Sequence, residues 1–152
     1  MTTPKRIQRG TTMNHLSKVY IVKISATVLF WSIPLLILPP HIFVDLGVLT
    51  SADDSMFLRL LGWAYLALCV NYAFGLQESL KENVVAGPII VGLVSNGGAC
   101  LWLLYFGASG AWTKYAFFVQ FVGWSSVAAT FFITLGLYLF GYKALTRTIA
   151  MD

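Results

Sequence analysis

Apolar residues in this chain fall into four long stretches, and short polar segments separate them. The stretches cover residues 20–39, 59–76, 85–108 and 114–141. A helix needs about 20 mostly apolar residues to cross the hydrocarbon core of a bilayer, and each stretch is near or above that length. The pattern therefore predicts an all-α integral membrane protein, a bundle of four helices with both chain ends on the same side.

Composition agrees with a membrane location. Of 152 residues, 58% are hydrophobic and 11% are charged, which is too apolar for a soluble domain of this size. We expect a basic N-terminal segment at 1–19, one transmembrane domain at 20–141 and a short tail at 142–152. The first stretch could also be a signal peptide. Its length and the lack of a small-x-small cleavage site in "PPHIFVDLGV" favour a retained helix.

The positions of the basic residues predict the orientation. One side of the predicted membrane domain would hold eight of the ten cations: Lys5, Arg6, Arg9, Lys18, Lys23, Lys81, Lys143 and Arg147. Arg59 and Lys114 lie on the other side. By the positive-inside rule both termini are then cytoplasmic. The net charge of +4 thus reflects topology, and anionic membrane lipids explain it without a nucleic-acid partner.

Four polar residues are predicted at one depth in the membrane: Thr27, Asn71, Asn96 and Ser126. Each is twelve positions from the outer end of its own stretch, which places it about 18 Å deep. Polar groups in hydrocarbon join helices when they are paired and are costly when they are not. The pattern favours an interhelical polar network, with a ligand site or a proton path built on the same groups as the alternative.

Small residues and one proline shape the predicted helices. The third stretch contains "GLVSNGGA" and the fourth contains "GWSSVAA", so we expect these two helices to contact each other closely. Pro34 lies inside the first stretch, where its missing N–H predicts a kink.

Few residues are suited to chemistry inside the predicted spans. Lys23 lies close enough to the start of its stretch to extend toward the cytoplasmic surface, and no stretch has an acidic residue, arginine or histidine near its middle. This argues against a proton-coupled exporter, which needs a carboxylate inside the membrane, because Glu78 lies at the edge of the second stretch. His15 and His41 lie outside the stretches, so we expect no haem and no other cofactor.

The two cysteines, Cys69 and Cys100, form no C-x-x-C motif. Their depths from the outer end are about 15 and about 12 Å, so the two thiols are candidate neighbours. A disulfide is one alternative, and two separate buried thiols that pack as small apolar groups are the favoured one.

A small polar cluster is predicted at the outer surface. His41 and Asp45 are four residues apart, and Asp53 follows in the same loop. Such a set suits acid/base chemistry, but a surface helix with a solvated charge pair explains it as well and is favoured. We expect no metal site here.

Two phrases in the first half of the chain, "LPPHIFVDLG" and "FLRLLGWAYLALCVNYAFGLQE", are followed by a glycine-rich third stretch. Over about residues 24–140 this arrangement resembles the small bacterial four-helix membrane proteins of the DoxX-like kind. The resemblance implies a four-helix fold in a bacterial inner membrane. Some relatives are subunits of quinone-using oxidoreductases, but this chain has no cysteine or histidine motif that would transfer that role.

These observations predict a non-enzymatic membrane protein, an accessory or stabilising subunit of a larger inner-membrane complex. Its partners would be other membrane subunits or a second copy of the chain. The alternative is a protein that binds or transports a lipid, a quinone or another small apolar molecule within the bundle. An enzyme that acts at the outer surface through His41, Asp45 and Asp53 is the least favoured hypothesis.

Overall fold

The computed structural model describes residues 14–51 and 55–149, and every regular element in this part of the chain is helical. The elements, in chain order, are α1 (His15–Thr27), the π-helical turn η1 (Val28–Ser32), α2 (Ile33–Ile37), α3 (Pro40–Asp45), α4 (Ser55–Leu80), α5 (Ala86–Ala108), α6 (Phe117–Gly136), the π-helical turn η3 (Leu137–Tyr142) and α7 (Lys143–Ile149). The predicted all-α class is confirmed for the residues described.

Four helices in the described segments are long and apolar enough to cross a membrane, as the sequence predicted: His15–Ile37, Ser55–Leu80, Ala86–Ala108 and Phe117–Thr146. The first helix begins five residues before the predicted start. Asn14 caps this helix, because its Oδ1 accepts a hydrogen bond from the N–H of Ser17 at 2.8 Å. Charged and polar residues before Tyr20 are therefore part of the helix.

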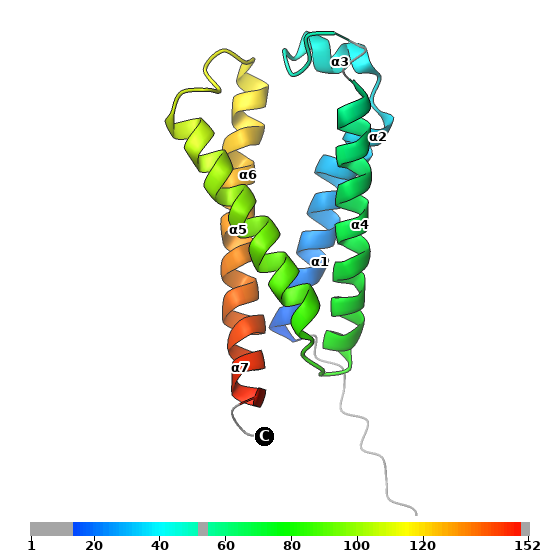
Figure 1. Ribbon diagram of the computed structural model, residues 1–152, viewed down its shortest axis with the longest axis vertical. Helices are drawn as coiled ribbons and strands as arrows, with labels where there is room; N and C mark the ends of the chain where they lie inside the picture. The colour runs from blue at the N-terminus through cyan, green and yellow to red at the C-terminus, as the bar shows by residue number, and fades with distance from the viewer. Residues whose placement is uncertain (1–13, 52–54, 150–152) are drawn as a thin grey trace, which may run out of the picture.

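The helices form two pairs. α1 packs along α4, and α5 packs along α6, which confirms the predicted contact between the two helices rich in small residues. Figure 1 shows the pairs together at the end where α1 begins and α7 ends, and separating toward α3. We call these the near end and the far end. The buried core lies toward the near end and consists of Leu16, Tyr20, Tyr72, Ile89, Ile133 and Leu137.

Two glycines allow the close approach of helices in this core. A Cβ atom at Gly75 would lie 2.7 Å from Pro88 Cβ, and a Cβ atom at Gly92 would lie 2.5 Å from Leu137 Cδ1. Neither distance is compatible with a side chain unless its neighbour shifts. Glycine thus brings α5 against both α4 and η3, as small residues do in other membrane bundles.

The structure has a π-helical turn where a kink was predicted. Because Pro34 has no N–H, it cannot bond the carbonyl group four residues before it, and a regular α-helix is interrupted there. The N–H of Ile33 donates instead to the carbonyl of Val28, five residues earlier, which closes the wide turn η1. The helix then continues as α2.

Arg59 of α4 fixes the end of the first long helix. The carbonyl of Leu35 would normally accept from residue 39, but Pro39 has no N–H. Arg59 Nη1 donates to this carbonyl at 2.7 Å, and Arg59 Nη2 donates to the carbonyl of Leu38 at 2.6 Å. The guanidinium group thereby satisfies the acceptors left at a helix C-terminus and holds the turn into α3 against α4.

Candidate functional site

A lysine lies inside the bundle. The Lys23 side chain is 8% exposed, and its position eight residues after the start of α1 puts it about 12 Å from the near end. The expectation that Lys23 extends to the membrane surface is therefore wrong. It depended on a helix that began at residue 20, whereas the Asn14 cap starts the helix five residues earlier, so Lys23 lies about two turns after the start.

The ammonium group of Lys23 contacts two other helices. Its Nζ donates to Asn96 Oδ1 of α5 at 2.5 Å. The same Nζ lies 5.5 Å from the centre of the Tyr72 ring of α4, a distance at which the ring face attracts a cation. Asn96 is 1% exposed and Tyr72 is fully buried, so both contacts are shielded from solvent.

Hydrogen bonds orient the groups around Lys23. The Asn96 Nδ2 donates to the carbonyl of Gly92 at 2.7 Å within α5, which directs Oδ1 of the same amide toward the ammonium group. The Tyr72 hydroxyl bonds Ser95 Oγ at 2.8 Å, with either group able to donate. We call Lys23, Tyr72, Ser95 and Asn96 the Lys23 site. It joins α1, α4 and α5 at one level.

The Lys23 site has no acidic residue. Within residues 14–51 and 55–149 the structure gives one salt bridge, Lys81 to Glu78 at 2.6 Å, and it lies at the near-end surface. An ammonium group has three N–H donors, and Asn96 accepts one of them. A lysine at the centre of a spanning helix costs about 2.5 to 3.5 kcal/mol to insert. The site can therefore hold helices together, and it can donate hydrogen bonds to an oxygen atom of a bound molecule.

The four polar residues predicted at one depth are not hydrogen-bonded to one another: Thr27, Asn71, Asn96 and Ser126. Asn96 pairs with Lys23, whereas the Ser126 hydroxyl donates to the carbonyl of Val122 in its own helix at 2.7 Å. Thr27 is buried, and the buried Asn71 Nδ2 has no partner. Residues at the same depth contact each other only if their side chains also point toward each other around the helix axes.

The polar cluster predicted at the outer surface is partly described. His41 and Asp45 both belong to the short helix α3 at the far end, and both are exposed. Asp53 lies outside the described residues. In the parts of the chain that the structure describes, no group of three histidine, cysteine, aspartate or glutamate residues is placed to hold a metal ion.

Both cysteines are free thiols. Cys69 is buried in α4, and the Cys100 thiol of α5 donates to the carbonyl of Val127 in α6 at 3.8 Å. The alternative of a disulfide is wrong. Cys69 is buried as expected, whereas Cys100 is half-buried.

Sequence reasoning placed Asn96 among the candidate site residues but did not place Lys23 beside Asn96 and Tyr72. The available signal was Asn14, because asparagine is among the residues favoured at the N-cap of a helix. Comparisons of the chain with models of protein families, with curated proteins and with solved structures found no match.

Proposed function

We propose that the protein binds, within its helix bundle, a small membrane-soluble molecule that presents an oxygen atom to Lys23. Lipids, quinones and other largely apolar molecules with a carbonyl or carboxylate group belong to this class. The proposal rests on the buried ammonium group of Lys23, which donates a hydrogen bond to one acceptor, Asn96, among the described residues.

The chemistry of the Lys23 site fits such a ligand. Ionisable groups within a membrane are rare and usually mark a functional site, because their insertion has to be compensated. A carbonyl or carboxylate oxygen accepts from the free N–H groups of the ammonium, and Asn96 holds that ammonium in place.

Retention of small molecules tests this proposal. The protein is extracted in mild detergent, and the molecules that remain bound are identified by native mass spectrometry. We expect a defined ligand on the parent protein and its loss in Lys23→Met and Asn96→Leu. Thr134→Val is the matched control, because the Thr134 hydroxyl donates to the carbonyl of Thr130 within its own helix. A parent protein with no bound molecule, or a ligand retained equally by Lys23→Met, would contradict the proposal.

A second function is favoured by the arrangement of the helix pairs. The pairs share a core toward the near end, and large apolar side chains on all four long helices are exposed, among them Phe30, Trp63, Trp102 and Phe132. These residues leave open apolar faces on the bundle. We propose as the second candidate a non-enzymatic accessory or stabilising subunit of a larger membrane complex, with the open faces contacting other subunits or a second copy. Gentle extraction should then co-purify a partner in fixed stoichiometry, and a clean monomer counts against it.

Both candidates share a proposed location in a bacterial inner membrane, with both termini cytoplasmic. α1 begins and α7 ends at the near end (Figure 1), which agrees with the side that holds most of the cations. Labelling of single cysteines introduced at Lys81 and at Lys114 tests the orientation, because an impermeant reagent added to intact cells should reach position 114 and not position 81. The DoxX-like resemblance, from which the bacterial location comes, stays a prediction.

A further inference from the structure

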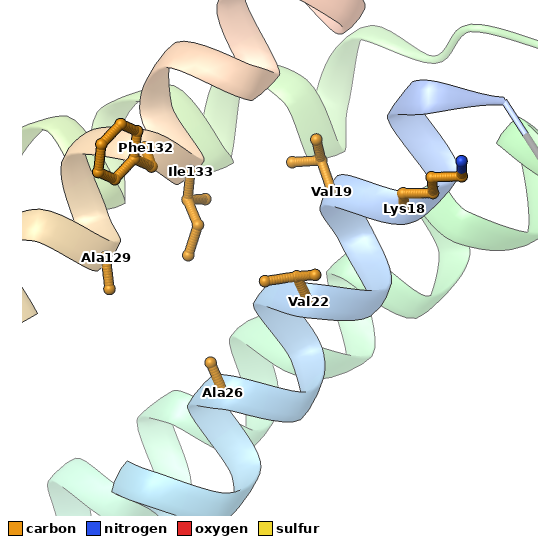
Figure 2. Close-up of a pocket in the computed structure, with 7 residues that line it drawn as sticks. All are labelled: Lys18, Val19, Val22, Ala26, Ala129, Phe132 and Ile133. Atoms are coloured by element: carbon orange, nitrogen blue, oxygen red, sulfur yellow. The ribbon is translucent and has the colours of Figure 1, made fainter.

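An apolar groove lies between α1 and α6, separate from the Lys23 site. Its volume is about 290 Å³. Val19, Val22 and Ala26 of α1 point toward Ala129 and Ile133 of α6, and Phe132 lies beside them (Figure 2). Apart from one lysine, every residue that lines the groove is apolar, and none is acidic.

The sequence explains why the groove is hollow. At its near end α1 and α6 touch, because a Cβ atom at Gly136 would lie 2.9 Å from Val19 Cγ2. Farther along, the short side chains of Ala26 and Ala129 face each other and do not fill the space between the helices (Figure 2). The glycine closes one end of the groove, and the alanines leave the rest open.

Lys18 gives the groove a charged end. It lies in the first turn of α1 and is exposed. Its carbon stem lines the groove, whereas its amine points away from the apolar residues (Figure 2). Ala26 lies eight positions after Lys18, about 12 Å along the helix.

We propose that this groove binds an anionic phospholipid, with one acyl chain along Val22 and Ala26 and the phosphate group at Lys18. The apolar lining suits a hydrocarbon chain, and the cation at the groove end suits a head group with net negative charge.

The charge at the groove end favours a lipid over a helix of a partner protein. One phospholipid molecule supplies both an acyl chain for the apolar lining and a phosphate group for Lys18.

Lipid exchange in nanodiscs tests the proposal. The full chain is reconstituted in equal parts of phosphatidylglycerol and phosphatidylcholine, released into mild detergent, and analysed by native mass spectrometry. We expect phosphatidylglycerol to be enriched on the parent protein. Lys18→Gln should lower that enrichment about fivefold, the order expected when one lysine near the membrane surface is lost. Ala129→Leu, which fills the groove without a change in charge, should lower the total amount of bound lipid.

Matched variants separate this site from general effects. Lys143→Gln removes a cation at the same end of the bundle, and Ala128→Leu adds the same bulk at an exposed position of α6. Neither residue lines the groove. Both variants should show the same phosphatidylglycerol enrichment and the same total amount of bound lipid as the parent. Lys23→Met should also retain the phospholipid, because Lys23 does not line the groove. The phospholipid result therefore does not depend on whether the Lys23 site binds a ligand. Equal retention of the two lipids by the parent, or unchanged retention in both Lys18→Gln and Ala129→Leu, would overturn the proposal.

Discussion

Replacement of Asn96 by leucine should destabilise the bundle because it leaves the Lys23 ammonium group without its acceptor. The two side chains are joined by a hydrogen bond of 2.5 Å, and both are more than nine-tenths buried. Leucine is close to asparagine in size and suits a membrane interior. The cost of the substitution is therefore the cost of the lost polar contact rather than of a cavity or a clash.

The expected magnitude follows from what each group loses. A hydrogen bond to a charged group contributes about 1.5 to 3 kcal/mol in soluble proteins, and contacts inside membranes average about 0.6 kcal/mol. Because Lys23 is both charged and buried, we expect Asn96→Leu to lower the free energy of unfolding by about 2 kcal/mol. Lys23→Met leaves a neutral amide oxygen unpaired and should cost about 1 kcal/mol. The double variant leaves neither group unpaired, but it still loses the hydrogen bond from Asn96 Nδ2 to the carbonyl of Gly92, so it should cost about 1 kcal/mol.

A double-mutant cycle measures the coupling between the two side chains. Unfolding of the four proteins in mixed detergent micelles is followed by circular dichroism, and the expected coupling energy is about 2 kcal/mol. The control cycle combines Lys23→Met with Asn71→Leu, whose Nδ2 has no partner, and its effects should add within about 0.5 kcal/mol. If the effects of Lys23→Met and Asn96→Leu on the free energy of unfolding also add within about 0.5 kcal/mol, the hydrogen bond does not stabilise the bundle and the reasoning fails.

Two other substitutions test the fold. Arg59→Met removes both donors to the end of α2, so hydrogen exchange of the backbone amides over residues 38–45 should accelerate by about tenfold. Unchanged exchange would show that the turn does not depend on this cap. Gly92→Ala places a Cβ atom 2.5 Å from Leu137 Cδ1 and should lower stability by about 1 to 3 kcal/mol, with partial rescue by Leu137→Ala. Gly98→Ala is the control, because no atom lies within 4 Å of the added methyl group, and equal losses at the two positions would contradict the packing argument.

The sequence predicted the four long helices and the contact between α5 and α6 because both depend on features that are local in the chain. The length of an apolar stretch decides whether a helix can cross a bilayer, and a run of small residues decides which face approaches a neighbour. The ends of the helices were predicted less accurately. The predicted starts at residues 20 and 114 differ from His15 and Phe117 in the structure.

The error in the first helix start explains why the Lys23 site was missed. With a start at residue 20, Lys23 lay three residues inside the membrane and its long side chain would reach the surface. The helix starts earlier, at the Asn14 cap, and the Lys23 side chain points into the bundle, to Asn96 and Tyr72. Contacts between residues more than forty positions apart depend on how the helices cross, which a single sequence does not encode in its periodicity.

A role in holding helices and a role in binding a ligand make different predictions for Lys23, even though both roles use the same hydrogen bond. A structural role requires Lys23→Met to lower stability by an amount that does not depend on added ligand. A ligand that binds the folded bundle stabilises it by about 2.7 kcal/mol at a hundred times its dissociation constant, and that gain should disappear in Lys23→Met. Stability measured with and without the molecule retained by the parent protein therefore separates the two roles. If Lys23→Met gains as much as the parent does from the added molecule, the Lys23 ammonium group holds the helices together and does not bind the ligand.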